Sequence, residues 1–327
     1  MVGSFHLTVS NSTVKYDFTI KRNITIIKGD SATGKTVLID MIHDYVTNGP
    51  DSGVTLSCDI PCRVIEGNTW EEQLKPITNS LVFIDEGNAF VSSSDFAEYV
   101  KEGKNYYIIV TREKLDNLPY SVSEIYGIKS SGKYGNLEPV FHETYQIYEE
   151  YTHNLPAGEV VTPDILITED TNSGHEFFSL SYCIEKCISA GGKSKVFNTI
   201  IETESKSILV IADGAAFGAE MERICELKKS NPNIHLYLPE SFEWIILNSG
   251  IIKDIPHDEI EHAENYADSS LFFSWERYYT NLIIQSTKNT HMAYSKANLS
   301  SYYKEPTIVN QIQKSIKGIN FGKVGEQ

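Results

Sequence analysis

The chain is short of cysteine, and its few cysteines form no pattern that would hold a fold together. The five cysteines are an odd number without the spacing of a zinc finger. Cys58 and Cys62 are four residues apart, as are Cys183 and Cys187, and each pair is either a metal-binding pair or two buried free thiols. The absence of a disulfide framework is typical of a reducing cytoplasm, where we expect this protein.

Long apolar runs and clusters of positive charge are also missing. No stretch reaches the ~18 apolar residues that span a bilayer. Residues 1–20 alternate like a strand and lack the features of a signal peptide, so we expect no membrane partner. Asp and Glu outnumber Lys and Arg by 44 to 28, which gives a net charge of −16. Such a chain is repelled by nucleic-acid phosphates unless basic residues or bridging metal ions gather locally. A nucleic-acid partner therefore requires a dedicated site.

The composition is otherwise that of a globular protein, and the length of 327 residues favours two domains. In the first ~115 residues, apolar runs typical of buried strands alternate with apolar residues at helical spacing. The predicted strands are Ile24–Lys28, Leu81–Ile84 and Tyr106–Val110, and the predicted helices are Lys35–Val46 and Phe90–Glu102. This alternation predicts an α/β fold with a parallel sheet.

The alternation of predicted strands and helices begins again after Asn154–Pro163, a segment that contains two prolines and a glycine. We therefore predict domains at residues 1–153 and 154–265, followed by an aromatic-rich helical tail at residues 266–327. Lys129–Glu138 looks like a loose segment. The second half is predicted to contain the strands Asp164–Thr168, Ser207–Ala212 and Ile234–Leu238 and the helices Gly174–Ile188 and Gly218–Lys229.

A complete phosphate-binding loop, G-x-x-x-x-G-K-[ST], stands between the first predicted strand and helix. Its glycines let backbone N–H groups surround phosphate oxygens, and the positive end of the helix adds to the attraction. Lys35 is expected to contact the β and γ phosphates of ATP, and the Thr36 hydroxyl to ligate Mg²⁺. The eight residues are Gly29, Asp30, Ser31, Ala32, Thr33, Gly34, Lys35 and Thr36.

The strand Leu81–Ile84 ends in two carboxylates, about fifty residues after the loop. Asp85 is expected to hold Mg²⁺ through water, and Glu86 to polarise the water that attacks ATP, which favours hydrolysis over binding alone. With the loop, this resembles the P-loop ATPases of the additional-strand type, which include the AAA+ and ABC families. The resemblance implies that Thr111 senses the γ-phosphate. Arg112 either contacts the nucleotide or is a solvated loop residue.

Two departures limit that resemblance. The chain has no LSGGQ-like ABC signature, and the domain is short for either family, which implies a reduced ATPase that senses ATP rather than a motor. ATPases of this kind often complete their site across a subunit interface, so we expect a homo-oligomer or a partner protein.

The second half places acidic residues after successive predicted strands. Glu169 and Asp213 follow the first two, and Glu243 lies just past the third. Parallel strands present their carboxyl ends at one edge of the sheet, so these carboxylates can converge on a hard cation such as Mg²⁺ or Mn²⁺. The arrangement resembles a Toprim-like domain, as in the OLD-family nucleases and related phage-defence proteins. The resemblance implies that Glu169, Asp213 and Glu243 bind metal, and that Glu169 and Asp213 are catalytic.

The Toprim-like pattern is incomplete. The usual pair of aspartates is reduced to Asp213-Gly214-Ala215, and Asp170 replaces the usual glycine after the first glutamate. The site therefore binds one metal, borrows Asp170 or Glu243, or is inactive.

The leading hypothesis is an ATP-regulated, metal-dependent nuclease in anti-phage defence. The alternative is an ATP-dependent sensor or assembly protein with a degenerate Toprim-like docking domain. A nucleotide kinase is disfavoured because Asp85-Glu86 promotes attack by water.

Overall fold

The computed structural model describes the chain in two compact units. The first comprises Met1–Phe141 with His262–Ser274, and the second comprises His142–Glu261 with Trp275–Gln327. The predicted boundary between residues 153 and 154 lies outside the described residues. Those are residues 1–327 except 30–32, 131–133, 140–159, 181–185, 205–206 and 323–327.

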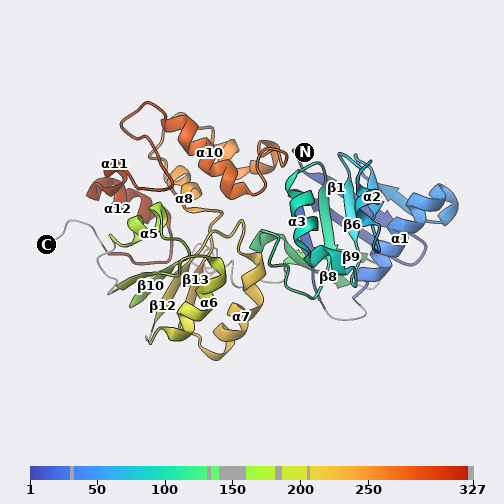
Figure 1. Ribbon diagram of the computed structural model, residues 1–327, viewed down its shortest axis with the longest axis horizontal. Helices are drawn as coiled ribbons and strands as arrows, with labels where there is room; N and C mark the ends of the chain where they lie inside the picture. The colour runs from blue at the N-terminus through green and yellow to red at the C-terminus, as the bar shows by residue number, and fades with distance from the viewer. Residues whose placement is uncertain (30–32, 131–133, 140–159, 181–185, 205–206, 323–327) are drawn as a thin grey trace. The chain divides into compact units, whose positions relative to one another are not determined.

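The first unit is built on a nine-stranded mixed sheet in the order β4-β1-β2-β9-β8-β3-β7-β6-β5 (Figure 1). The five strands from β8 to β5 run parallel to one another, whereas β1 pairs antiparallel with β2 and β4. The strands are β1 Phe5–Ser10, β2 Lys15–Ile20, β3 Ile24–Ile27, β4 Thr55–Ser57, β5 Cys62–Val64, β6 Leu81–Ile84, β7 Tyr106–Val110, β8 Ile125–Ser130 and β9 Tyr134–Pro139.

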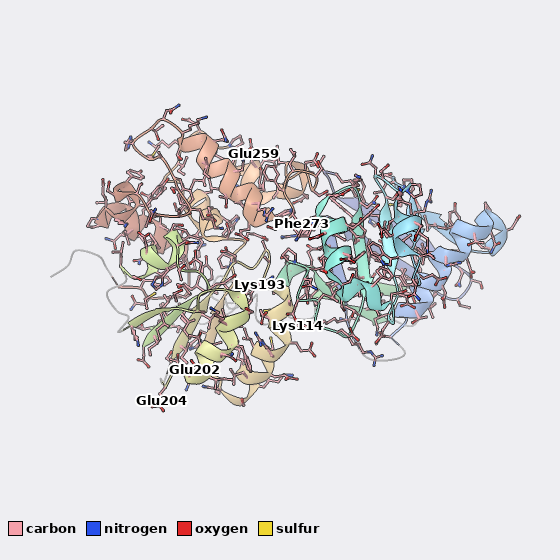
Figure 2. The ribbon with its side chains drawn as sticks, viewed as in Figure 1. Lys114, Lys193, Glu202, Glu204, Glu259 and Phe273 are labelled. Atoms are coloured by element: carbon pink, nitrogen blue, oxygen red, sulfur yellow. The ribbon has the colours of Figure 1, made fainter. Side chains whose placement is uncertain are left out.

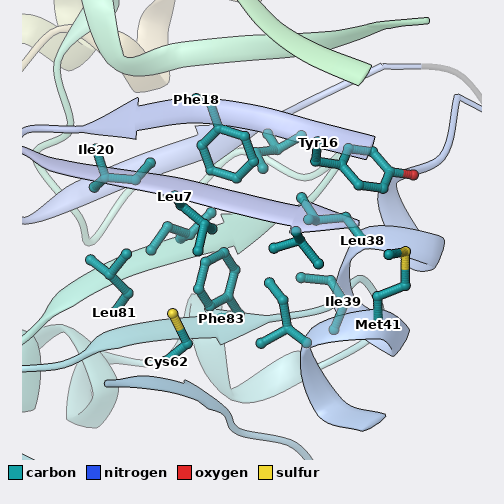
Figure 3. Close-up of a cluster of buried hydrophobic side chains, with 14 of the residues drawn as sticks. Leu7, Tyr16, Phe18, Ile20, Leu38, Ile39, Met41, Cys62, Leu81 and Phe83 are labelled. Carbon is teal, nitrogen blue, oxygen red and sulfur yellow. The ribbon is translucent and has the colours of Figure 1, made fainter. Parts of the chain in front are cut away.

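The three central strands β3, β6 and β7 are buried along their whole length, as their continuous apolar sequences predict. Successive side chains of a strand point to opposite faces. Phe83 and Ile108 therefore join the cluster that packs against Leu38 of α1 (Figure 3), whereas Tyr107 meets Phe96 of α3 edge to face. Helices thus cover both faces of the parallel part of the sheet.

The helices of the first unit are short apart from α1, which follows the phosphate-binding loop. The Ser93 hydroxyl caps α3 by accepting from the N–H of Phe96. The helical elements are α1 Lys35–Asn48, η1 Gly49–Ser52, α2 Trp70–Leu74, η2 Ala89–Ser92, α3 Ser94–Lys101, η3 Val122–Glu124 and η5 Ala263–Asn265.

The second unit holds a four-stranded, wholly parallel sheet in the order β11-β10-β12-β13. Figure 1 shows α6 and α7 on one side of it and α5 and α8 on the other. Its strands are β10 Ile165–Thr168, β11 Lys186–Ser189, β12 Ile208–Ile211 and β13 Ile234–Tyr237. Its helical elements are α5 Ser173–Phe178, α6 Lys193–Glu202, η4 Gly218–Glu220, α7 Met221–Ser230, α8 Phe242–Asn248, α9 His257–Glu261, α10 Trp275–Thr287, α11 Ser301–Lys304 and α12 Pro306–Ser315.

The α/β class and the parallel sheet of the second unit agree with the sequence prediction, whereas the sheet of the first unit is mixed, with antiparallel pairs β1–β2, β1–β4 and β8–β9. Two local predictions were also wrong. In the predicted loose segment Lys129–Glu138, Lys129 and Ser130 belong to β8 and Tyr134–Glu138 belong to β9, because their backbones pair in an antiparallel ladder. The helix predicted over Gly174–Ile188 ends at Phe178, and Lys186–Ser189 is a strand paired with β10. Among the described residues, no helix is both long enough and apolar enough to cross a membrane.

Candidate nucleotide site and acidic site

The phosphate-binding loop connects β3 to α1, and both its glycines have a backbone that only glycine adopts easily. Gly29 has φ +135° and Gly34 has φ +92°, in the left-handed range. The ammonium of Lys35, which is 5% exposed, folds back onto the loop. It donates to the Gly29 carbonyl at 2.8 Å and to Thr33 Oγ1 at 3.1 Å. Asp30, Ser31 and Ala32 lie outside the described residues.

Tyr16, which the sequence did not single out, contacts the end of the loop. Tyr16 on β2 donates its hydroxyl to the Gly34 carbonyl at 2.8 Å. A Cβ at Gly34 would lie 2.7 Å from the Tyr16 oxygen, so this position excludes a side chain for a second reason. Thr36 is exposed in the first turn of α1, where its hydroxyl is open to a ligand.

Strand order brings the second motif to the same edge of the sheet. β7 lies between β3 and β6, and the N–H of Thr111 donates to the Ile27 carbonyl at 3.2 Å. The residues after these strands therefore share one edge. Burial raises the pKa of Asp85, and the charges of Asp40 and Glu86 raise it further, whereas Lys35 lowers it. A divalent cation fits this crowding of negative charge.

Glu86 is held by an arginine. Its Oε1 lies 2.9 Å from Nε of Arg112, and its N–H donates to Asp85 Oδ1 at 2.8 Å. These three residues line one pocket with Asn88 and Thr111. Thr111 is 6% exposed, and its hydroxyl accepts from the N–H of Glu113 rather than facing open solvent. Arg112 therefore has a specific partner at the site.

In the second unit, Glu169 and Asp213, two of the three residues predicted to bind metal, meet at the carboxyl ends of β10 and β12. Glu169 Oε2 accepts from the N–H of Asp213 at 3.1 Å, and Asp213 Oδ1 accepts from the N–H of Phe242 at 3.1 Å. With Asp170 and Gly174 they line a small pocket. Since the strands are parallel and adjacent, this meeting follows from the register Thr168 to Ile211.

Burial and mutual repulsion raise the pKa values of the carboxyl groups in this pocket. Burial raises the pKa of Glu169 to about 7, and Glu276 and Asp170 raise it as well. Burial followed by repulsion from Glu276 and Glu169 raises the pKa of Asp213 well above its usual value. Burial also raises the pKa of Asp170. Such crowded carboxyl groups favour either a proton or a bound cation.

Three residues of this site come from the C-terminal part of the chain and were missed. Lys296 Nζ hydrogen-bonds Glu276 Oε1 of α10 and lies 3.8 Å from Glu243 Oε1. The Tyr294 hydroxyl donates to the same Glu243 oxygen at 2.9 Å. The sequence of this region showed aromatic residues at helical spacing, and no local pattern distinguishes Lys296 from an ordinary surface lysine.

Lys193, labelled in Figure 2, adds a second ammonium from the start of α6. It donates to the Ala216 carbonyl at 3.3 Å, and its charge lowers the pKa of Glu169. A hydrogen bond joins the glycine turn before Lys193 to the site, because the N–H of Gly192 donates to the Glu169 carbonyl at 2.7 Å.

Carboxyl groups that suit a divalent cation line this pocket in Glu169, Asp170 and Asp213, and Glu243 follows the lining residue Phe242. Glu243 is 1% exposed, and its buried Oε2 has no hydrogen-bond partner in the described part of the chain. Carboxylate oxygens are the ligands that Mg²⁺ and Mn²⁺ prefer. As the side chains stand, no three Asp, Glu, His or Cys residues among those described form a ready metal-binding group.

No protein-family model matches the chain, and no curated protein matches it significantly.

Proposed function

We propose that the first unit binds and hydrolyses ATP in the manner of the additional-strand P-loop ATPases. The observation that carries this is the placement of Lys35 and Asp85 after β3 and β6, with β7 between them and Thr111 at its end. Thr36 and Asp85 would hold Mg²⁺, which would neutralise charge on the phosphates. The loop N–H groups and the start of α1 would bind the phosphate oxygens.

Glu86 is the proposed base for the attacking water. Its ion pair with Arg112 is largely exposed, with side chains 38% and 51% accessible, so it is weak and opens readily. Entry of the γ-phosphate would give Arg112 a more negative partner and leave the Glu86 carboxylate to accept a proton.

ATP binding and turnover of the purified full chain test this assignment. Lys35→Ala should abolish both, because the loop loses its charge. Glu86→Gln should keep nucleotide binding and lower turnover by about 100-fold, the usual contribution of a general base. Lys101→Ala, an exposed lysine at the end of α3, is the control. Full turnover in Lys35→Ala would reject the assignment.

We infer that the second unit is a metal-dependent nuclease of the Toprim-like kind, controlled by the first. Glu169, Asp213 and Glu243 would hold the cation, which would activate water and steady the phosphodiester. The support is the contact between Glu169 and Asp213, together with the buried Glu243 oxygen that has no partner among the described residues. Lys193 and Lys296 would attract the phosphate that the net charge of −16 repels.

One observation favours the alternative, an ATP-dependent sensor or assembly protein whose second unit is a docking domain. The Lys296 ammonium already neutralises Glu243 and Glu276 in the place where a cation would be expected. A site satisfied by its own lysine needs no metal ion.

Cleavage of plasmid, single-stranded DNA and tRNA with Mn²⁺ or Mg²⁺, with and without ATP, separates the two. A nuclease should lose cleavage in Asp213→Ala, and Lys35→Ala should change its response to ATP. Lys253→Ala, an exposed lysine of the second unit, should cleave normally. No cleavage by the unaltered protein, together with ATP turnover, would favour the docking domain.

A further inference from the structure

A lysine from the C-terminal part of the chain lies between two carboxylates of the acidic site. The ammonium of Lys296 is hydrogen-bonded to Glu276 Oε1, in the first turn of α10. It also lies 3.8 Å from Oε1 of Glu243, in the first turn of α8. One positive charge is therefore shared by carboxylates of two separate helices, which is the position that a bridging metal ion would take.

Glu276, which the sequence did not single out, acts on the same group of charges. Burial raises the pKa of Asp213, and the charge of Glu276 raises it further. Burial and the charge of Glu276 likewise raise the pKa of Glu169. Two residues after Asp213, where a second aspartate is expected, the chain has Ala215. Glu276 therefore brings a further carboxylate to this site from α10.

Glu243 lacks one contact that a lysine does not supply. Its side chain is 1% exposed, and its Oε1 accepts from the Tyr294 hydroxyl at 2.9 Å. Its buried Oε2 has no hydrogen-bond partner in the described part of the chain. A buried carboxylate oxygen without a partner is costly, and a divalent cation can bind both oxygens of one carboxylate. The unsatisfied oxygen therefore points to a ligand other than an ammonium group.

The backbone around Lys296 is anchored independently of its ammonium. The Lys296 carbonyl accepts from the N–H of Ser173 at 3.2 Å, and the N–H of Tyr294 donates to Thr287 Oγ1 at 3.0 Å. The Tyr294 hydroxyl also lies 2.7 Å from Ser173 Oγ. The Lys296 side chain is 32% exposed and consists of a flexible four-carbon stem. Its ammonium can therefore turn toward solvent while the backbone stays in place.

Charge favours the exchange of this ammonium for a divalent ion. Burial lowers the pKa of Lys296, but the charges of the surrounding carboxylates, with Glu243 first, raise it by more. Lys296 is therefore protonated at neutral pH and supplies one positive charge. The same carboxylates would receive two positive charges from Mg²⁺ or Mn²⁺, whose preferred ligands are carboxylate oxygens.

We propose that Lys296 holds the position of a divalent cation between Glu243 and Glu276, and that an arriving cation displaces its ammonium and takes Glu276 as a ligand. The proposal rests on the metal-dependent function proposed above for the second unit. It makes the lysine a competitor of the metal ion. The apparent affinity for the metal is lowered by the fraction of molecules in which the ammonium has left the site.

Mn²⁺ binding to the full chain without nucleotide, followed by electron paramagnetic resonance of free Mn²⁺, tests this competition. Lys296→Met keeps the side-chain length and removes the competitor, so Mn²⁺ should bind at least about tenfold more tightly. Lys193→Met is the matched control, because Lys193 donates to the Ala216 carbonyl rather than to a carboxylate. It should change the affinity much less. Equal tightening in both variants would indicate general repulsion of cations and overturn the proposal.

An amine-reactive reagent reports the displacement itself. Acetylation by an N-hydroxysuccinimide ester, mapped by mass spectrometry, should label Lys296 slowly in EDTA and severalfold faster in Mg²⁺, because the amine leaves its carboxylate partners. Lys253 is exposed and is the internal reference, with the same rate in both conditions. An unchanged rate at Lys296 under conditions in which the metal binds would overturn the proposal.

Glu276→Gln separates a metal ligand from a residue that only holds the lysine. A ligand that loses its charge should weaken Mn²⁺ binding, even though Lys296 is then released. Tighter binding in Glu276→Gln would show that Glu276 is not a ligand. Equal Mn²⁺ affinities of the unaltered chain and Lys296→Met would reject the displacement and leave the metal-dependent function standing. No binding by either protein would reject that function, and the proposal with it.

Discussion

Glu86 and Glu169 both follow the end of a strand, but their different surroundings suit them to different roles. Glu86 is exposed and paired with Arg112, so water can reach it. Glu169 is largely removed from water and accepts a backbone N–H, and its pKa is about 7. The first suits the orientation of a water molecule, and the second suits a site that gains a cation or a proton.

Arg112 should influence catalysis more than stability. Because its ion pair is exposed, Arg112→Ala should change the free energy of unfolding by less than about 0.5 kcal/mol. Under the proposed ATPase function, turnover of ATP should fall by about tenfold, because the arginine would no longer compensate phosphate charge. Denaturant unfolding and steady-state ATPase measurements check both. Arg277→Ala, in the second unit, should alter neither. A large loss of stability with normal turnover would show a structural role instead.

The crowded carboxyl group of Glu169 predicts a pH effect on the metal-free protein. Its pKa is raised from the unfolded value of 4.5 to about 7, so the native state holds the proton more tightly. Its contribution to stability is therefore full below pH 4.5 and is lost as the pH rises through 7. Relative to Glu169→Gln, the protein in EDTA should lose about 1 to 2 kcal/mol between pH 5 and pH 8. Parallel stability curves for the two proteins would contradict this.

At the scale of elements, a close backbone approach joins distant parts of the first unit. Gly103, just after α3, contacts the returning segment His262–Ser274. A Cβ at Gly103 would lie 2.0 Å from the Ser269 carbonyl oxygen, while the Ser269 hydroxyl donates to the Gly103 carbonyl at 2.9 Å. This segment completes the first unit although it comes from far along the chain.

Gly103→Ala tests that contact, and Gly53→Ala is its matched control. Both glycines have left-handed backbones, with φ +66° and φ +73°, but nothing lies within 4 Å of a Cβ at Gly53. Gly53→Ala should cost about 1 kcal/mol from backbone strain alone. Gly103→Ala should cost at least about 2 kcal/mol more, because two backbones must separate. Equal losses in thermal or denaturant unfolding would show that the segment is not held there.

At the scale of the whole molecule, the net charge of −16 governs which partners can approach. Phosphate backbones meet long-range repulsion, which only a local concentration of cations can offset. The charges of Lys193 and Lys296 act on the crowded carboxyl groups of the second unit, and a bound divalent ion would add the remaining positive charge.

If the second unit is the proposed nuclease, its binding of nucleic acid should depend on divalent ions. Labelled single-stranded DNA and RNA should show no binding in EDTA at ~150 mM salt, and Ca²⁺ or Mn²⁺ should restore it. The double variant Glu169→Gln with Asp213→Asn should lose that restoration, because the cation loses its charged ligands. Fluorescence anisotropy measures all three states. Equal binding with and without divalent ions would place the nucleic-acid contact elsewhere.

Much of the fold could be predicted because the signals are local. The buried strands β3, β6 and β7 and the helix α1 follow from apolar runs and helical spacing within a few residues. The β8–β9 hairpin and the strand β11 were missed, because each depends on a partner strand that supplies its hydrogen bonds. Contact between Gly103 and Ser269 likewise has no local signal.

The sequence by itself determined the match to a phosphate-binding motif, the acidic strand ends and the excess of negative charge. A turn with left-handed glycines, and carboxylates placed after apolar strands, are properties of a few consecutive residues. Only the tertiary structure decided what surrounds those groups. Tyr294 and Lys296 reach Glu243, and Arg112 reaches Glu86. Their positions follow from chain packing, because contact between side chains and exclusion of water arise only when separate elements come together.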